Sequence, residues 1–292
     1  MTNDKLIFIG WFSAGVDSAV ACKLALDKGL PVVLYYIETG ASHPDSIRFL
    51  HDCENWYGQK INIVQSRRYS SPFDCVVKEK MIGAVKICTD KLKRSFYNSV
   101  AKEWEQKGYK VINIIGYDYT PHEVNVRAFN YVGSAEERAI RLKLERGMNH
   151  YFPLIEEKFD KQRCKNILAA AGIKEPEMYS LGFKHNNCIG CIKAGKAYWA
   201  LIRKLFPDEF AKWAKLERKQ GAAILKKAVG KNEEGKNIYG PDYLDEIPAD
   251  YPAHDKDPFA CDGFFCTTAE HQAREFAIKG DISLLYCKEA KQ

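Results

Sequence analysis

Short apolar runs alternate with longer amphipathic segments through the first half of the chain. The runs have the Val, Ile and aromatic content of buried strands, and comprise residues 6–11 (LIFIGW), 31–38 (PVVLYYIE), 60–66 (KINIVQS) and 110–118 (KVINIIGYD). The segments between them have helical periodicity and end in glycine, and comprise residues 17–29, 43–58 and 92–108. Strands that alternate with helices of this length predict an α/β fold, in which a parallel sheet carries helices on both faces. Ligands of such sheets bind beyond the carboxyl ends of the strands.

The pattern changes towards the C-terminus. Residues 194–220 are strongly helical, residues 230–258 are rich in Gly, Pro and acidic residues and are predicted to be mostly loop, and residues 268–280 predict a final helix. We therefore expect an α/β domain over residues 1–186 and a small helical C-terminal region over residues 187–292.

The helical segment 194–220 interleaves basic and aromatic residues. The basic residues are Arg203, Lys204, Lys212, Lys215, Arg218 and Lys219, and the aromatic residues are Trp199, Phe206 and Trp213. Such a segment either forms a nucleic-acid-binding surface or packs its aromatic residues inward and exposes its charges to water. The second arrangement is the more common one.

Composition restricts the class of protein. The chain has 292 residues, of which 46% are hydrophobic, and a net charge of +6; this suits a substantial core and an anionic partner, either nucleotide or nucleic acid. No apolar run approaches the roughly 20 residues of a membrane span, and the first residues lack the features of a signal peptide, so we expect a cytoplasmic protein that does not enter a membrane. Its ten cysteines are then expected to be core residues, metal ligands or nucleophiles.

The first predicted strand ends in a polar turn, SAGVDS, at residues 13–18. A turn that holds Ser13, Gly15, Asp17 and Ser18 can direct backbone N–H groups and hydroxyls at an anion, and the following helix adds its dipole. The turn is not the G-x-x-x-x-G-K-[ST] phosphate loop, because no lysine follows the glycine. An ordinary βα turn with a capping side chain is the alternative interpretation.

Two close cysteine pairs, Cys188 with Cys191 and Cys261 with Cys266, have spacings that can place four thiolates around one metal ion. The remaining question is which metal they bind. Cys22, Cys53, Cys75 and Cys164 lie on apolar helix faces instead, and we expect them to be core residues.

Five segments, in the same order along residues 6–195, resemble motifs of the adenine-nucleotide α-hydrolase superfamily. Residues 13–18 resemble its S-G-G-x-D-S pyrophosphate loop, with Ala14 in place of a glycine, so the turn must distort if that position needs a positive φ. The others resemble motifs of phosphoadenylyl-sulfate (PAPS) reductases, and are residues 35–50 (I-D-T-G-x-x-x-P-E-T-x-x-F), 88–100 (C-x-x-x-(R/L)-K), 114–129 (G-x-R-x-x-E-x-x-R) and 181–195 (G-Y-x-S-I-G-C-x-x-C-T). The segments resemble in particular phage- or plasmid-borne members of the PAPS reductase-like family.

The resemblance implies a set of site residues. Those implied to bind nucleotide are Ser13, Ala14, Gly15, Asp17, Ser18, Glu38, Thr39, Gly40, Lys91, Lys93 and Gly116, and those implied to be catalytic are Asp17, Ser18, Glu123 and Arg127. The family's first arginine after Gly116 is Tyr or Asp here. Asp17 is implied to position the phosphates through Mg²⁺ or to order the turn by capping. His43 and His122 begin predicted helices near these motifs, where they contact phosphate or are merely solvated.

The resemblance also bears on the metal. In the reductases the C-x-x-C pair joins an upstream cysteine pair to hold a [4Fe–4S] cluster, whereas here the upstream pair is reduced to Cys88. Cys88, Cys188 and Cys191 with Cys261 or Cys266 would suit such a cluster, which we favour by a small margin. The two C-terminal pairs, Cys188 with Cys191 and Cys261 with Cys266, would suit structural Zn²⁺ equally well.

The leading functional hypothesis is an enzyme that cleaves ATP between the α- and β-phosphates and adenylates an acceptor, in sulfur transfer. The acceptor is a small molecule or a nucleic acid such as tRNA or DNA, and the protein is compatible with a homo-oligomer. A sulfonucleotide (PAPS) reductase is one alternative, although the only cysteine near the C-terminus, Cys287, lacks the reductases' E-C-G-L-H context. A non-catalytic nucleotide- or nucleic-acid-binding module with structural zinc is the alternative of another class.

The metal content tests the cysteine hypotheses. Loss of one thiolate from a four-cysteine site removes the metal and much folding energy, so the Cys88→Ser and Cys261→Ser proteins, prepared anaerobically, are to be assayed for iron, zinc and sulfide. Iron lost from Cys88→Ser supports the cluster, and zinc kept in Cys88→Ser but lost from Cys261→Ser supports the zinc site. A wild-type protein with neither metal would contradict both versions.

Overall fold

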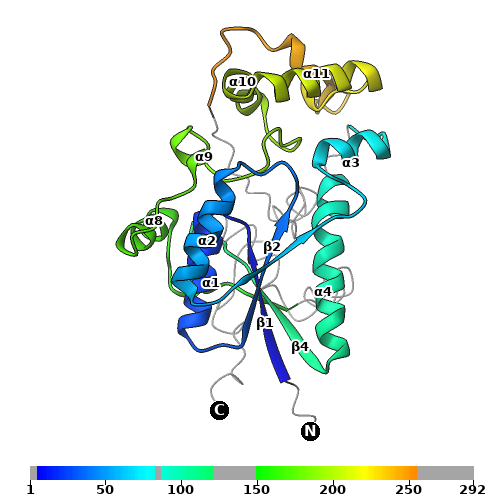
Figure 1. Ribbon diagram of the computed structural model, residues 1–292. Coiled ribbons are helices and arrows are strands. Elements are labelled where there is room, and N and C mark those ends of the chain that lie inside the picture. Colours follow the sequence, from blue (N-terminus) through cyan, green and yellow to red (C-terminus); the bar gives the residue numbers. More distant parts are fainter. Residues whose placement is uncertain (1–4, 83–86, 121–148, 255–292) are drawn as a thin grey trace.

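The computed structural model describes residues 5–82, 87–120 and 149–254. Their centre is a five-stranded sheet in the order β3-β2-β1-β4-β5, in which every neighbouring pair is parallel. The strands are β1 Lys5–Phe12, β2 Val32–Glu38, β3 Ile61–Gln65, β4 Tyr109–Ile114 and β5 Asn149–Tyr151. Helices cover both faces, as Figure 1 shows for α1 and α2 on one side and α4 on the other. The predicted fold class is confirmed.

Side chains alternate between the two faces of the sheet along β1, and this alternation explains why helices pack on both faces. Phe8 and Phe12 pack on one face with α1 (Val16–Asp27) and α2 (Asp45–Tyr57), while Ile7, Ile9 and Trp11 pack on the other face with α4 (Ser95–Gln106). Because both faces of β1 are buried, the strand has a nearly continuous apolar sequence.

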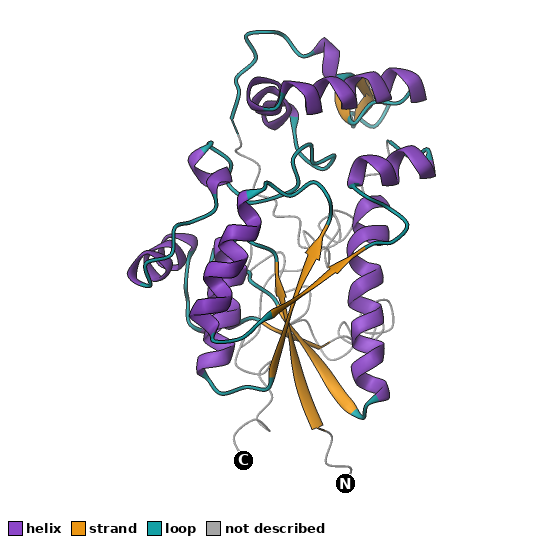
Figure 2. Ribbon diagram, viewed as in Figure 1, coloured by secondary structure: helices purple, strands orange, loops and turns teal. Residues whose placement is uncertain are grey.

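The remaining elements lie beside the helices that cover the sheet or beyond the carboxyl ends of its strands (Figure 2). They are α3 Pro72–Glu79, a π-helix Thr89–Arg94, α7 Pro153–Glu156, α8 Lys161–Ala170, α9 Glu177–Ser180, α10 Lys196–Leu205, α11 Pro207–Gln220, β6 Leu225–Lys231, β7 Asn237–Asp242 and a 3₁₀-helix Leu244–Glu246. No helix in the described ranges combines the length and apolar character that crossing a membrane requires.

A second core lies under α10 and α11. Its centre is Trp199 and Trp213, which are 0% and 1% exposed, so the aromatic residues of segment 194–220 face inward. This core also takes in residues of α3 and of the π-helix, so it draws on both sides of position 186. The division of the chain at residue 186 stays a prediction.

The structure adds detail to two expectations for the C-terminal part. The segment 194–220 is helical as predicted, and it is divided into α10 and α11 because Pro207 has no N–H to continue α10 and instead begins α11. The segment 230–258 is less loop-like than predicted, because β6 and β7 form an antiparallel hairpin. Its turn is held by the Asn232 side chain, which accepts the N–H groups of Glu234 and Lys236, and by Gly235 at φ 75°. Composition identified the turn but not the strands around it.

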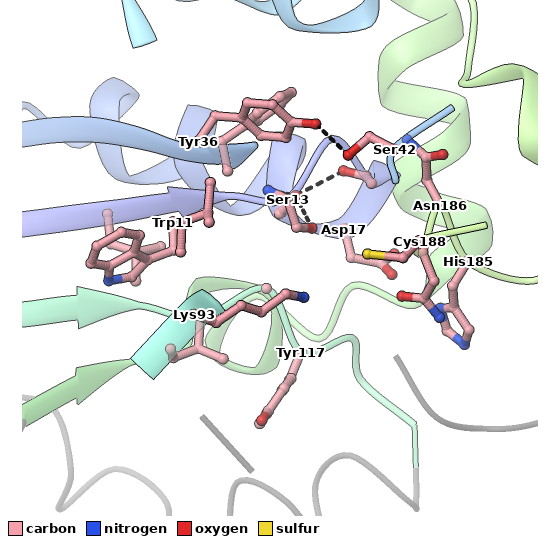
Figure 3. A pocket seen from close by; sticks show the side chains of 18 of the residues that line it. Trp11, Ser13, Asp17, Tyr36, Ser42, Lys93, Tyr117, His185, Asn186 and Cys188 are labelled. Atoms are coloured by element: carbon pink, nitrogen blue, oxygen red, sulfur yellow. Dashed lines mark hydrogen bonds between the residues drawn. The ribbon is translucent and has the colours of Figure 1, made fainter. Parts of the chain in front are cut away.

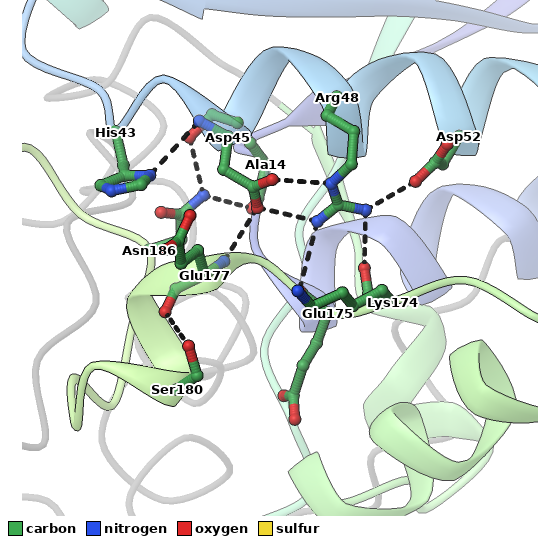
Figure 4. A network of polar contacts seen from close by, with 11 residues as sticks. Ala14, His43, Asp45, Arg48, Asp52, Lys174, Glu175, Glu177, Ser180 and Asn186 are labelled. Atoms are coloured by element: carbon green, nitrogen blue, oxygen red, sulfur yellow. Dashed lines mark hydrogen bonds and ion pairs between the residues drawn. The ribbon is translucent and has the colours of Figure 1, made fainter.

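Arg48 ties α2 to the segment that leads into α9 (Figure 4). Its guanidinium makes a two-pronged contact with the Asp45 carboxylate, at 2.7 Å for each oxygen, and also contacts Asp52 at 2.6 Å. It donates to the carbonyls of Lys174 and Glu175, and the N–H of Glu177 donates to Asp45. These bonds attach residues 174–177 to α2. Residues 179–188, several of which line the pocket described below, follow directly along the chain.

We expect Arg48→Met to lower the free energy of unfolding by about 1–3 kcal/mol at pH 7, since it breaks hydrogen bonds to charged groups and leaves two carbonyls without a donor. The bonds from Arg48 hold the pKa of Asp45 below its usual value. The contribution of the pair is therefore present at neutral pH and is lost as the pH falls through that lowered pKa.

Urea denaturation of both proteins between pH 7 and roughly pH 3 measures this effect. The difference between them should shrink at the acid end. Lys236→Met, which removes an exposed ion pair with Glu234, is the control and should change little. An unchanged stability in Arg48→Met would contradict the structural role.

Candidate functional site

A pocket opens at the carboxyl edge of the sheet, between β1 and β4. From β1 the chain leads to β2 and β3 on one side, whereas β4 and β5 lie on the other, so this edge is the point at which the strand order reverses. Open α/β sheets bind ligands at such points. The pocket is lined by the end of β1, the turn at residues 13–18, the end of β2, residues 114–118 and residues 185–188 (Figure 3).

Many of the residues predicted from the motifs meet in this pocket. They are Ser13, Gly15, Asp17, Ser18, Thr39, Lys93, Gly116 and Cys188. Glu38, Gly40 and Lys91 are described but are not among the lining residues. Glu123, Arg127, His122, Cys261 and Cys266 lie outside the described residues.

Ser18 is the centre of the turn. Its hydroxyl accepts the Ser13 N–H at 3.1 Å and the Ser13 hydroxyl at 2.9 Å, and donates to the Gly15 carbonyl at 3.0 Å. Gly15 is the N-cap of α1, so Asp17 stands inside the first turn of the helix and does not cap it. The turn therefore holds its shape through its own serines.

Ala14, which stands where the motif has a glycine, has a left-handed backbone conformation. Its φ is 56°, in the left-handed region, which costs an alanine roughly 1–2 kcal/mol. The Asn186 amide donates to the Ala14 carbonyl at 2.7 Å and to the Ser46 hydroxyl at 3.0 Å. The turn thus keeps a positive φ at this position, and a residue far along the chain holds it there.

Gly116 lets the end of β4 approach the turn. A Cβ atom at this position would lie 2.8 Å from both the Cα and the N of Ser18. The contact is with backbone, which cannot move aside as a side chain can. Position 116 therefore needs the smallest residue.

Lys161, the first residue of α8, reaches the turn from a helix that packs against α1. Its ammonium lies 2.5 Å from Asp17 Oδ2 and 3.5 Å from His185 Nδ1. Burial raises the pKa of the Asp17 carboxyl, against the opposing effect of the lysine. Burial alone disfavours the Lys161 ammonium, but the carboxylate outweighs it and the pKa of Lys161 is raised. The other oxygen, Asp17 Oδ1, is buried and has no hydrogen-bond partner among the described residues.

The end of β2 is shaped by Glu38 and Gly40. The Glu38 carboxylate accepts the Gly40 N–H at 2.6 Å, and the Tyr36 hydroxyl lies 2.9 Å from Ser42 Oγ and 3.2 Å from Glu38 Oε2. Glu38 thus orders this turn. Gly40 has a φ of 74°, and a Cβ there would come within 1.8 Å of the Ser70 carbonyl oxygen.

The two thiols of the C-x-x-C pair have different surroundings. Cys188 lines the pocket, with its Sγ 3.1 Å from Thr39 Oγ1, whereas Cys191 is buried in the second core. The Tyr198 hydroxyl donates to the Cys188 carbonyl at 2.9 Å and accepts the Cys191 N–H at 3.3 Å. Cys88 packs against the same core as Cys191. Within the described ranges, no three Cys, His, Asp or Glu side chains form a group that could hold a metal.

The four cysteines expected in the core are there. Cys22, Cys53, Cys75 and Cys164 are each at most 1% exposed. Burial raises the pKa of the Cys75 thiol to about 11, which makes thiolate chemistry at neutral pH unfavourable. His43 Nδ1 accepts the Asp45 N–H at 3.3 Å, and His43 is not among the residues that line the pocket; its contact with phosphate stays a prediction.

Several lining residues were missed by sequence reasoning. They are Asp118, Lys161, Tyr179, His185 and Asn186. Asp118 and the pair His185 and Asn186 lie inside segments that resemble family motifs, at positions where this chain departs from them: Asp118 replaces an arginine, and His185 and Asn186 replace a serine and an isoleucine. Lys161 and Tyr179 lie in a stretch without any recognised motif, so no local signal marked them.

Comparison with known proteins gives likenesses of fold. No protein-family model matches the chain, and no curated protein sequence matches it. The solved structures that resemble it include PAPS reductase from Candida auris (15% identity, TM-score 0.43, covering 61% of this chain and 78% of that one) and the U34-tRNA thiolase NcsA from Methanococcus maripaludis with its [4Fe–4S] cluster (17%, 0.43, 75% and 74%). NMN synthetase from Francisella tularensis is a third (14%, 0.39, 59% and 63%).

All three are members of the adenine-nucleotide α-hydrolase superfamily that the motifs predict. The phage or plasmid subtype stays a prediction. Likenesses with TM-scores this low say nothing about substrate or reaction. Only the residues of the site bear on these two questions.

We expect Gly116→Ala to destabilise the protein by about 1–3 kcal/mol, because the new methyl group overlaps the backbone of Ser18. Thermal and urea unfolding measure the change. Gly230→Ala is the matched control, since nothing lies within 4 Å of a Cβ there and its φ is not positive. Equal stabilities of the two variants would show that the close approach is not a constraint.

Proposed function

We propose that this chain is an enzyme that binds an adenine nucleotide in the pocket at the carboxyl edge of the sheet. The observation that carries the proposal is the turn at residues 13–18, which stands at the N-terminus of α1 and at the strand-order reversal, open to the pocket. Backbone N–H groups and a helix dipole at such a point favour phosphate groups. The apolar side chains of Phe12, Ile37 and Ile114 line the same pocket and offer a surface for a purine ring.

The proposed reaction is cleavage of ATP between the α- and β-phosphates. An acceptor oxygen attacks the α-phosphorus, the bond to the β-phosphate oxygen breaks, and pyrophosphate leaves while AMP stays on the acceptor. The protein's part in such a transfer is positioning and neutralisation of phosphate charge. The turn would hold the phosphates, and the acceptor, whether small molecule, tRNA or DNA, would enter from the pocket mouth.

The residues of the pocket fit Mg²⁺. Asp17 Oδ1 is buried without a partner among the described residues, and the Asp118 carboxylate lines the same pocket. Mg²⁺ is commonly bound through one or two carboxylates together with substrate phosphates. When bound, it would neutralise charge on the phosphates; Asp17 and Asp118 would hold it.

Within the described residues, Cys88, Cys188 and Cys191 form no group that could hold an iron–sulfur cluster, and Cys261 and Cys266 lie outside these residues. Ala14 in place of a glycine would favour the non-catalytic alternative if it distorted the turn, but its φ of 56° lies in the left-handed region that a glycine adopts readily.

Calorimetry with adenosine, AMP, ATP, PAPS and GTP tests the binding proposal. We expect ATP to bind more tightly than GTP, and Ser18→Ala to weaken ATP binding about tenfold, because the turn loses the hydroxyl that accepts and donates its internal bonds. Ser99→Ala, which removes a hydroxyl on the exposed face of α4, should bind as the wild type does.

Product analysis tests the reaction. With a competent acceptor, ATP should yield AMP and pyrophosphate. ADP and phosphate as the main products would contradict cleavage at the α–β position, and absence of any nucleotide binding would contradict the whole proposal.

A further inference from the structure

Three observations single out Lys161 among the side chains of the pocket. The turn at residues 13–18 contains no cation, and the hydroxyls of Ser13 and Ser18 bond to each other. The cationic side chains that line the pocket in the described ranges come from other elements, and Lys161 is the one whose ammonium is bonded to the turn, through Asp17. A turn that is to hold several phosphate charges needs such a cation near it.

The position of Lys161 on its own helix is electrostatically unfavourable. It is the first residue of α8, where the helix dipole disfavours a positive charge. The helix is capped without it, because the Asp160 carboxylate accepts the Arg163 N–H at 2.7 Å. Stability of α8 therefore does not explain why a lysine stands there.

The ion pair itself leaves the ammonium able to bind more. A lysine ammonium has three N–H donors, of which one is directed to Asp17 Oδ2 at 2.5 Å, while the His185 ring nitrogen lies farther away, at 3.5 Å. The side chain is still 26% exposed, within the pocket. Asp17 thus fixes the position of the Lys161 ammonium and leaves it accessible from the pocket.

We propose that Lys161 is the phosphate-binding lysine of this site, supplied from α8 in place of the lysine that other phosphate loops carry in their own turn, and that Asp17 is its positioning residue. Asp17 Oδ2 holds the ammonium beside the turn, and a nucleotide phosphate oxygen takes a further N–H of the same group. Asp17 Oδ1 remains available to a metal ion. The proposal rests on the proposed nucleotide binding and assigns its principal cation.

Calorimetry with adenosine, AMP and ATP in the presence of EDTA isolates this contact, because no Mg²⁺ then links Asp17 to the phosphates. In the wild type, AMP and ATP should bind more tightly than adenosine. Lys161→Met should leave adenosine binding unchanged and weaken ATP binding by about 10- to 100-fold. Lys161→Arg, which keeps the charge, should retain most of the difference between ATP and adenosine.

The double variant Asp17→Asn/Lys161→Met separates a phosphate contact from simple charge neutralisation. If Lys161 served only to neutralise Asp17, removing both charges would restore ATP affinity to the wild-type value, and the proposal would be overturned. If Lys161 binds phosphate, the double variant stays as weak as Lys161→Met. This variant also has no unpaired buried carboxylate, so it guards against a loss of affinity that comes only from misfolding.

Lys107→Met is the control. Lys107 follows α4, pairs with Glu103 at 2.7 Å and is not a lining residue, so its loss should leave all three affinities unchanged. A wild type that binds adenosine but gains nothing from phosphates in EDTA would overturn the role of Lys161 alone. A wild type that binds none of the three would overturn the proposed function instead.

Discussion

The close approach of β4 to the turn at residues 13–18 is the constraint on which the pocket depends. Gly116 meets the backbone of Ser18 at a distance that excludes any side chain, so the two carboxyl ends that border the strand-order reversal lie next to each other. A parallel sheet brings such ends to one edge. Gly116 therefore sets the distance between the end of β4 and the turn at residues 13–18, which both line the pocket.

Three further side-chain interactions hold the turn at residues 13–18. Ser18 joins its two ends, Asn186 holds the carbonyl of the strained Ala14, and Lys161 holds Asp17. Asn186 and Lys161 come from segments more than 140 residues away along the chain. Their placement depends in turn on the packing of α8 against α1 and on the Arg48 network that anchors residues 174–177 to α2.

The same packing places the two thiols of the C-x-x-C pair, Cys188 and Cys191, in different surroundings. The C-x-x-C segment lies between the pocket and the second core, and the Tyr198 hydroxyl bonds to the backbone on both sides of it. Gly190, at φ 74°, turns the chain between the two cysteines where a Cβ would meet the Trp213 ring at 2.6 Å. One thiol therefore belongs to the pocket and the other to the second core, within four residues of sequence.

The sequence by itself determined four strands of the parallel sheet, the helices α1, α2 and α4 and much of one side of the pocket, because strand and helix periodicities and the S-A-G-V-D-S turn are local properties. It also marked Gly116 and Thr39, through short motifs. Only the tertiary structure placed Lys161, Tyr179 and Asn186 beside the turn, since their roles arise from contacts between segments that share no local signal. For the same reason it alone decided that Ala14 keeps a positive φ and that Cys188 and Cys191 face different surroundings: both depend on what packs against them, and sequence spacing does not encode that.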